Sequence, residues 1–268
     1  MKPKISIIIP VYEPELDIFN KLKENLRKQT IPFEIIEKWN NPEAVSMNLG
    51  IKEARGDIIV ILSQDCVPKT KYWLEKLVSP LESKEVVATI SDLLLPEWHW
   101  KKYDFLLRLL IINERNILYP DLDIRACAFR KKDLIDVGMI NEENRVGMDT
   151  KLYMKLRDKG KIIRANEIVF HLHNQKNFRS ALKKLYDYSK GNGKMVRMYT
   201  TRLYLYDLSL RIMRAFPFFG FMSILYRFPL KKYFYLLPFY IIMIAPAIHI
   251  ANVFGFWRGF FSKKEYSI

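Results

Sequence analysis

The stretch Ile58-Ile-Val-Ile-Leu-Ser-Gln-Asp-Cys-Val-Pro68 decides the fold. Its first five residues are apolar without a polar break, which predicts a strand that is covered on both faces, as in a parallel sheet. Similar runs at Ile5 to Ile9 and at Glu34 to Ile36 predict two more strands. The polar residues after Leu62 therefore stand at the carboxyl end of a buried strand, and Asp65 is the acid among them.

Helical patterns separate these strands. Leu16 to Gln29 has apolar residues at spacings of three and four, and Ala44 to Ala54 ends just before Gly56. The alternation of strand and helix predicts a doubly wound α/β domain. Further along we expect a helix carrying Tyr72 to Val78, strands at Glu85 to Ile90 and from Arg125, helices at Lys132 to Asp136 and Thr150 to Asp158, and one or two strands within Ile162 to His173. Residues 96–120 carry no structural prediction.

The last part of the chain has a different composition. Tyr233 to Trp257 contains no Asp, Glu, Lys or Arg over 25 residues, a length that can span a bilayer. Lys231 and Lys232 precede it, aromatic residues crowd both ends, and Arg258, Lys263 and Lys264 follow. Pro238 and Pro246 argue against a straight helix. We predict a domain at 1–178, a basic helical connector at 179–215 and a membrane-associated or transmembrane region at 216–268; the alternative is an apolar helical pair packed on a soluble domain.

The 268 residues carry 44 Lys and Arg against 29 Asp and Glu, and the net charge of +15 suggests a polyanionic partner. The two cysteines, Cys66 and Cys127, have no metal-ligand spacing and indicate a reducing, cytoplasmic location. The first apolar run is too short for a signal peptide. GxGxxG, GxxxxGK[ST], HExxH and GxSxG motifs are all absent from the sequence, which argues against the enzyme classes they define. No nucleic-acid recognition module is evident, so we do not expect a nucleic-acid partner.

Asp65 has two interpretations from its position alone. Open α/β sheets bind ligands beyond the carboxyl ends of their strands, where a carboxylate can hold a divalent cation and the cation can neutralise a diphosphate. The alternative is a turn or helix-capping Asp before Pro68.

Three ordered segments within residues 4–173 resemble family 2 glycosyltransferases of the GT-A fold. They are ISIIIPVYE at 5–13, AVSMNLGIKEARGDIIVILSQDCVP at 44–68 and VGMINEENRVGMDTKLYMKLRDKG at 137–160. The Asp-x-Asp usual in the family is represented by Ser63-Gln64-Asp65, a form similar to that of rhamnosyltransferase-like members. The resemblance implies a GT-A, Rossmann-like, mostly parallel sheet flanked by helices, here followed by an apolar helical tail.

The resemblance also implies roles for individual residues. Asp65 would coordinate Mg²⁺ or Mn²⁺ on the donor diphosphate, and His173, or alternatively His171, would complete the metal site. Asp149 matches the second acid of the family's Glu-Asp pair, the general base, while Met148 replaces the first. From the residues alone, the two histidines could instead be satisfied by backbone partners, and Asp149 is also a good N-cap for the helix that follows.

The remaining expected site residues bind donor and acceptor. Arg125, Lys183 and Lys184 are expected to bind acceptor or phosphate, although the basic stretch from Arg179 to Arg197 could equally be a solvated face. Glu37 and Trp39 stand where the family reads the nucleotide base, and a surface Trp is an equally plain explanation. The donor set comprises Pro10, Tyr12, Glu37, Trp39, Asn48, Gln64 and Asp65.

These features together predict an inverting glycosyltransferase. It would use a nucleotide-diphosphate sugar and a lipid-linked or cell-surface glycan acceptor at the cytoplasmic face of the cell membrane. One alternative is a polyprenyl-phosphate sugar synthase. The other, favoured by Ser63, Met148 and the altered 37–41 segment, is a non-catalytic nucleotide-binding GT-A-like membrane protein.

Overall fold

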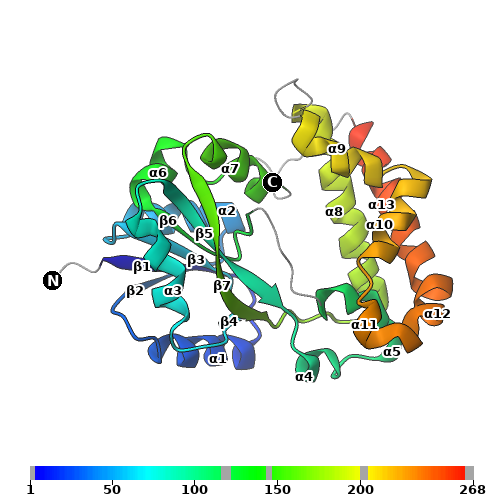
Figure 1. The fold of residues 1–268 in the computed structure, drawn as a ribbon, viewed down its shortest axis with the longest axis horizontal. Helices are drawn as coiled ribbons and strands as arrows, with labels where there is room; N and C mark the ends of the chain where they lie inside the picture. Colours follow the sequence, from blue (N-terminus) through cyan, green and yellow to red (C-terminus); the bar gives the residue numbers. More distant parts are fainter. Residues whose placement is uncertain (1–3, 116–121, 143–146, 200–204, 263–268) are drawn as a thin grey trace. The chain divides into compact units, whose positions relative to one another are not determined.

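The computed structural model describes residues 4–115, 122–142, 147–199 and 205–262 (Figure 1). It contains two compact units. One comprises Met1–Pro96 and Ile117–Asn174, and the other comprises Glu97–Asn116 and Gln175–Ile268. We refer to them as the sheet unit and the helical unit. Residues 97–116, for which the sequence predicted nothing, thus belong with the C-terminal part of the chain.

The sheet unit is built on one seven-stranded sheet of order β2-β1-β3-β6-β5-β7-β4. The strands are β1 (Ile5–Val11), β2 (Glu34–Trp39), β3 (Ile58–Leu62), β4 (Cys66–Pro68), β5 (Val86–Leu94), β6 (Ala126–Arg130) and β7 (Lys161–His171). Among the described residues, three strand pairings are parallel and three are antiparallel. The sheet is therefore more mixed than apolar runs alone suggest, since a run buried on both faces has the same composition in either orientation.

Helices cover both faces of this sheet. They are α1 (Leu16–Arg27), α2 (Glu43–Glu53), α3 (Trp73–Val78), α6 (Lys131–Asp136) and α7 (Met148–Arg157), with a 3₁₀ turn at Ser79–Glu82. Ile7 and Ile9 of β1 pack in one cluster with α1 and α3, whereas Ile8 packs in another with α2, α6 and α7. Successive side chains of a strand point to opposite faces, so β1 supplies both layers of the core (Figure 1).

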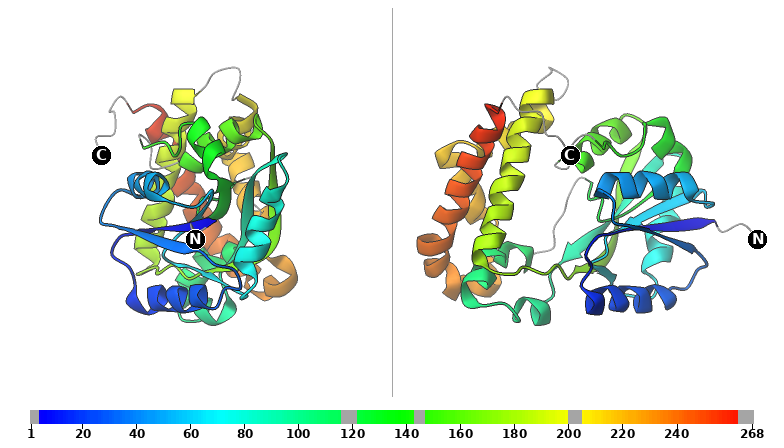
Figure 2. Two further views of the ribbon diagram at one scale, coloured as in Figure 1. Left: turned by 90° about the vertical axis from the view of Figure 1, so that its left-hand side faces the viewer. Right: turned by 180° about the vertical axis from the view of Figure 1, so that it is seen from behind.

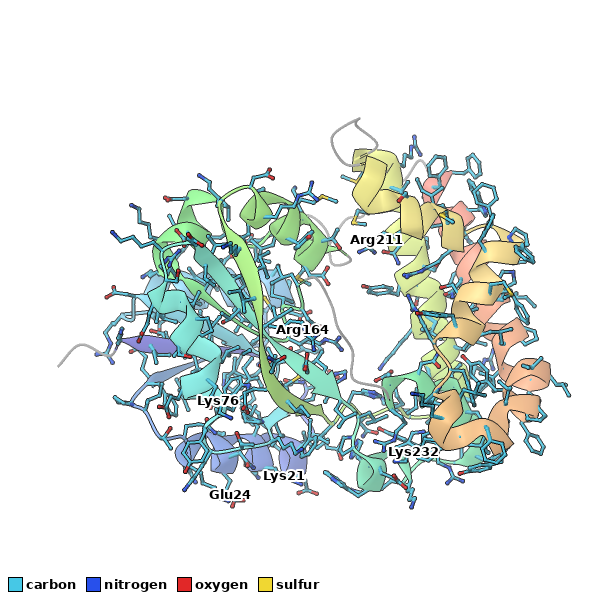
Figure 3. All side chains as sticks on the ribbon, in the orientation of Figure 1. Lys21, Glu24, Lys76, Arg164, Arg211 and Lys232 are labelled. Atoms are coloured by element: carbon cyan, nitrogen blue, oxygen red, sulfur yellow. The ribbon has the colours of Figure 1, made fainter. Side chains whose placement is uncertain are left out.

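The helix predicted from Leu16 is confirmed, and its buried face comprises Ile18, Phe19, Leu22 and Leu26. Leu16 itself lies at the first turn and is 66% exposed. Toward the other side of the sheet, Arg164 of β7, labelled in Figure 3, donates to both carboxylate oxygens of Asp92 on β5. Asp92 is buried, so this ion pair fixes the two parallel strands where their register is irregular.

The helical unit is organised around two long helices that lie side by side (Figure 2). Its elements are α4 (Glu97–Trp100), α5 (Phe105–Leu110), a 3₁₀ turn (Ile112–Arg115), α8 (Phe178–Tyr199), α9 (Leu205–Arg214), α10 (Pro217–Tyr226), α11 (Leu230–Tyr233), a 3₁₀ turn (Phe234–Leu236), α12 (Leu237–Phe239), a π turn (Tyr240–Ile244) and α13 (Ala245–Phe260). Leu230–Phe260 forms a helical segment of 31 residues that is long and apolar enough to cross a membrane.

Glycine permits the close approach of α8 and α13. A Cβ atom at Gly259 would lie 1.9 Å from the carbonyl oxygen of Lys190, far inside van der Waals contact. Ser189 Oγ donates to the carbonyl oxygen of Asn252 at 2.6 Å. The two backbones therefore touch, as they do where small residues line a helix interface.

Candidate functional site

The carboxyl ends of β1, β2 and β3 lie next to one another. Val11 at the end of β1 pairs with Trp39 at the end of β2, and β1 also pairs in parallel with β3. Tyr12, Trp39 and Gln64 therefore stand at one edge of the sheet, as the order of strands and helices predicts. We call this the carboxyl edge.

Gln64, just after β3, is hydrogen-bonded to Tyr12, just after β1. Its Oε1 accepts a hydrogen bond from the backbone N–H of Tyr12, and its Nε2 donates to the carbonyl oxygen of Tyr12, both at 2.9 Å. Only a side chain that both donates and accepts can make this pair of bonds. The Tyr12 ring is 60% exposed, whereas Pro10 is buried within β1 and pairs with Lys38. Tyr12 can thus contact a ligand directly, and Pro10 shapes the strand beneath it.

Glu37 and Trp39 act as a pair. The strand expected to stop at Ile36 continues to Trp39, and the indole Nε1 donates to Glu37 Oε2 at 3.1 Å. The Trp39 ring also meets Phe19 edge-on, with centroids 5.7 Å apart, and is 44% exposed. A nucleobase could stack on this indole, while hydrogen bonding to Glu37 would have to share the carboxylate with Trp39.

The side-chain amide of Asn48 forms hydrogen bonds within the protein. Its Nδ2 donates to the carbonyl oxygen of Ile140 at 2.8 Å and to Glu142 Oε1 at 2.7 Å, while its Oδ1 accepts from the Ile140 N–H. The residue is buried in α2. Asn48 thus holds residues 140–142, which precede α7 in the chain, against α2.

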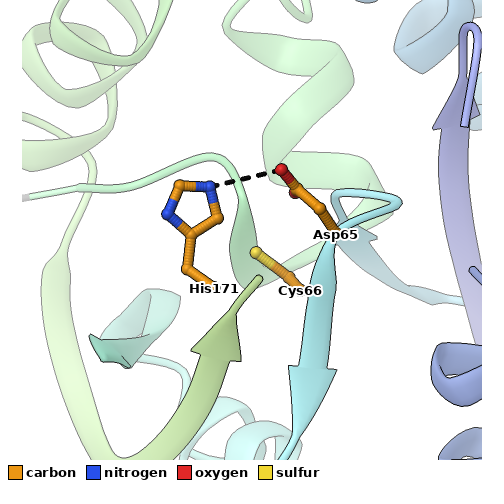
Figure 4. A group of neighbouring side chains, drawn as sticks. All are labelled: Asp65, Cys66 and His171. Carbon is orange, nitrogen blue, oxygen red and sulfur yellow. Dashed lines mark ion pairs between the residues drawn. The ribbon is translucent and has the colours of Figure 1, made fainter. Parts of the chain in front are cut away.

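Asp65 lies at the end of a chain of polar contacts (Figure 4). His171 Nε2 is 3.4 Å from Asp65 Oδ2, and Arg125 Nη1 is 3.3 Å from His171 Nδ1. Arg125 in turn donates through Nε and Nη2 to both carboxylate oxygens of Asp123, at 2.9 and 2.6 Å. Because a guanidinium only donates, in the neutral form of His171 Nδ1 accepts from Arg125 and Nε2 carries the proton that faces Asp65.

The charges around Asp65 favour its ionised form. Burial by itself would raise the pKa of this carboxyl, but His171, His173 and Arg125 together hold the pKa well below its usual range. Burial opposes ionisation of Asp123 in the same way, and Arg125 outweighs it and lowers the pKa of Asp123. Two carboxylates thus flank one guanidinium and one imidazole.

The side chains of Asp65, Cys66 and His171 could together hold a metal ion, since their ligand atoms lie within 4.8 Å of one another. Burial and the charge of Asp65 raise the pKa of the Cys66 thiol, so it stays protonated and is a poor ligand for a hard cation. A carboxylate oxygen and an imidazole nitrogen suit Mn²⁺. His171 faces Asp65 directly, and His173 is buried against the His171 ring, with centroids 4.6 Å apart.

Asp149 does not cap its helix as predicted. The N-cap of α7 is Gly147, whose positive φ of 84° suits glycine, and Asp149 lies in the first turn. Its Oδ1 accepts from the Thr150 N–H at 2.8 Å. The negative charge of Asp149 contributes to raising the pKa of Cys127 on β6, after the larger effects of burial and Asp123. Residues 143–146 of the quoted motif lie outside the described residues.

Lys183 and Lys184 lie on α8 in the helical unit, and both are exposed. Lys184 Nζ donates to Gln175 Oε1 at 3.2 Å.

Asp123 was missed by sequence reasoning. The Asp123-Ile-Arg125 spacing, which places opposite charges two residues apart just ahead of a strand, was the available signal.

A seven-stranded mixed sheet with helices on both faces, with a carboxylate and an imidazole where its strands end, has the architecture of the GT-A class of glycosyltransferases. The mannosyltransferase PcManGT from Pyrobaculum calidifontis, solved in complex with GDP-Man and Mn²⁺, superposes with a TM-score of 0.62. It is 12% identical, and the match covers 98% of this chain and 89% of that one. This likeness establishes the shared fold.

Residues 17–138, just under half of the chain, match the family described as Glycosyl transferase family 2, which supports a glycosyltransferase. The O-antigen biosynthesis protein RfbC of Myxococcus xanthus is 27% identical over 124 residues, which cover 35% of this chain and 10% of that protein. The chain thus matches about a tenth of the length of this curated relative.

Proposed function

We propose that the protein transfers a sugar from a nucleotide-diphosphate sugar to a lipid-linked or cell-surface glycan acceptor, with inversion at the anomeric carbon. The observation that carries this proposal is the contact of Asp65 with His171 beside Arg125, next to the carboxyl edge. An ionised carboxylate, an imidazole and a guanidinium in one place fit a cation and a diphosphate.

Asp65 would be the primary ligand for the divalent cation, Mg²⁺ or Mn²⁺, through its carboxylate. His171 would be the second ligand, through Nε2 in the tautomer that carries its ring proton on Nδ1. When bound, the cation supplies positive charge to the diphosphate as it departs. Arg125, held in place by Asp123, is positioned to pair with a phosphate oxygen in the same region.

The donor base would be bound at the carboxyl edge, with Tyr12 and Trp39 offering exposed rings and Glu37 a carboxylate. Gln64 holds the Tyr12 backbone, so the edge is arranged before the donor arrives. The similar mannosyltransferase was solved with GDP-Man, which makes GDP-mannose the first donor to test.

Asp149 is the proposed general base. A carboxylate in the first turn of a helix that packs on the sheet can accept the proton of an acceptor hydroxyl. The hydroxyl oxygen then forms the new bond to the anomeric carbon on the face opposite the departing nucleoside diphosphate, which keeps the electrons of the broken bond. An acceptor that is already an ionised phosphate, as in a polyprenyl-phosphate sugar synthase, would need no such base.

We place the reaction at the cytoplasmic face of the cell membrane. The apolar segment Leu230–Phe260 and the exposed lysines of α8 support attachment to a membrane that contains anionic lipid. Two buried free cysteines fit a reducing compartment.

A thermal-shift panel of nucleotide sugars, with and without Mn²⁺, tests the donor half of the proposal. We expect one donor to raise the melting temperature only with the cation present, and Asp65→Asn to remove that rise. Asp158→Asn, at a carboxylate that is 79% exposed, is the matched control and should respond as wild type.

Transfer itself is measured with the donor so identified. Asp149→Asn should keep the donor-induced shift and slow transfer to a glycan acceptor. An unchanged transfer rate would remove Asp149 as the base. Donor binding without transfer to any glycan or lipid-phosphate acceptor would instead favour a non-catalytic nucleotide-binding protein.

A further inference from the structure

The C-terminal part of the apolar segment, α13, is packed on a charged helix, α8. Ser189 Oγ bonds the carbonyl of Asn252, and Arg197 Nη1 bonds the carbonyls of Phe260 and Ser262 at 3.4 and 2.7 Å. Gly259 lets the α13 backbone meet the Lys190 carbonyl. These contacts join α8 and α13 at several positions over more than two turns.

The register of the two helices decides what lies beside the middle of the apolar segment. The Ser189–Asn252 and Arg197–Phe260 contacts join residues 63 positions apart, and the Gly259–Lys190 contact joins residues 69 apart, so the helices run parallel. These separations place Lys183 and Lys184 beside residues 246–253 and Asp187 beside residues 250–256. The centre of Leu230–Phe260 is at residue 245.

This arrangement conflicts with a simple membrane span. If Leu230–Phe260 crossed the bilayer, α8 would enter the hydrocarbon with it, since the two helices are interlocked. Lys183 and Lys184, both exposed on α8, would then stand within the hydrocarbon core of the bilayer. Charged side chains there are strongly disfavoured unless they are paired or face water.

Apolar side chains are exposed elsewhere on the helical unit. α13 packs against both α10 and α8. We define the apolar face as the exposed residues Phe218, Phe219, Met222, Tyr226, Phe234, Tyr235, Phe239, Ile242, Met243, Ile250 and Phe254. Exposed Lys231 and Lys232 lie on α11, and exposed Arg258 lies on α13.

We propose that the helical unit inserts this apolar face sideways into one leaflet of an anionic phospholipid bilayer and does not span it. This deepens the proposed function and rests on its membrane attachment. The apolar face enters the acyl boundary, the lysines and arginine meet lipid phosphates, and α8 stays in water. Both ends of Leu230–Phe260 then remain on the same side of the membrane, with the sheet unit.

Cysteine labelling in sealed vesicles tests this topology with the full chain. Both native cysteines are buried, so Lys231→Cys and Ser262→Cys each introduce one site for a membrane-impermeant maleimide. The protein is bound to sealed phosphatidylcholine vesicles containing phosphatidylglycerol. We expect both variants to be labelled equally before and after detergent. Labelling of either position only after detergent would show a span and overturn the proposal.

Flotation with the same vesicles tests the apolar face. Ile242, 75% exposed, is the target, and Met198, 46% exposed on α8, is the matched control. Ile242→Ser should lower vesicle partitioning by about tenfold, the fold-change expected for losing one inserted aliphatic side chain, and Met198→Ser should leave it unchanged. Equal effects of the two substitutions would contradict insertion through this face.

The outcomes distinguish sideways insertion from the proposed membrane attachment and sugar transfer. Failure of the wild-type chain to float would overturn both membrane attachment and sideways insertion. Labelling on opposite sides would overturn sideways insertion alone. Sugar transfer enters neither measurement, so a loss of the transferase assignment would be seen separately.

Discussion

Arg125→Met should destabilise the sheet unit, because it leaves Asp123 buried without its guanidinium. The Asp123 side chain is 9% exposed, and Arg125 donates two of its hydrogen bonds through the guanidinium and a third through its backbone N–H. Breaking a buried ion pair by removing one partner costs about 3–5 kcal/mol. Arg125 is 33% exposed, so water already weakens the pair, and we expect a loss of about 2–4 kcal/mol.

The loss should depend on pH in a definite direction. Arg125 holds the pKa of Asp123 below its usual range, so the pair contributes stability above the unfolded pKa, and wild type loses it as pH falls through the folded pKa. In Arg125→Met, burial without a partner raises the pKa of Asp123 instead. Lowering the pH from about 7 to about 5 should therefore reduce the gap between variant and wild type, because protonation removes the buried charge.

Urea unfolding at several pH values measures both effects, and a double variant tests their cause. Asp123→Asn in the Arg125→Met background should restore more than half of the lost free energy of unfolding, since a neutral amide replaces the unpaired charge. Arg157→Met is the control, because its partner Asp158 is 79% exposed, and should cost below about 1 kcal/mol. The reasoning is refuted if Arg125→Met costs no more than this control, or if the double variant is no more stable than Arg125→Met.

Three further predictions concern the carboxyl edge, the helix pair and acid stability. Gln64→Ala removes both bonds to the Tyr12 backbone and should raise the KM for the donor more than it lowers kcat; a fall in kcat alone would contradict this. Gly259→Ala should destabilise the helical unit by about 1–3 kcal/mol in urea unfolding, because its Cβ would overlap the Lys190 carbonyl, and an unchanged midpoint would mean that the helices do not touch there. Burial opposes ionisation of Glu34, but its bonds from Ser6 and Arg55 lower its pKa to about 2, so wild type should lose stability as pH falls from about 4.5 toward 2, and a Glu34→Gln variant should show a flatter profile in the same range.

Local sequence patterns were sufficient for the individual elements near the site. Five apolar residues at Ile58–Leu62 form β3, and the periodic pattern from Phe19 to Leu26 forms the buried face of α1. These patterns are informative because the side-chain periodicities of a strand and of a helix involve residues that are close in sequence. The family motifs around Asp65 carried the glycosyltransferase assignment, and the matching family and fold confirm it.

Other expectations failed because they depended on backbone geometry. Asp149 suits an N-cap by residue type, yet Gly147 takes that position because the chain enters α7 at a positive φ. The mixed orientation of the sheet was hidden for a similar reason, since Ala126–Arg130 is as apolar as a parallel strand and runs antiparallel to both neighbours.

The sequence by itself determined the class of fold, the edge at which the first strands end and the acid that stands there. Only the tertiary structure determined which side chains surround that acid. Asp65 meets His171 because β4 pairs antiparallel with β7, and Arg125 reaches His171 from 46 positions away. The charged helix beside the apolar segment is likewise determined by packing, since the contacts between α8 and α13 join residues 63 to 69 positions apart. Contacts at such separations depend on how elements pack, and local residue patterns do not specify the packing of distant elements.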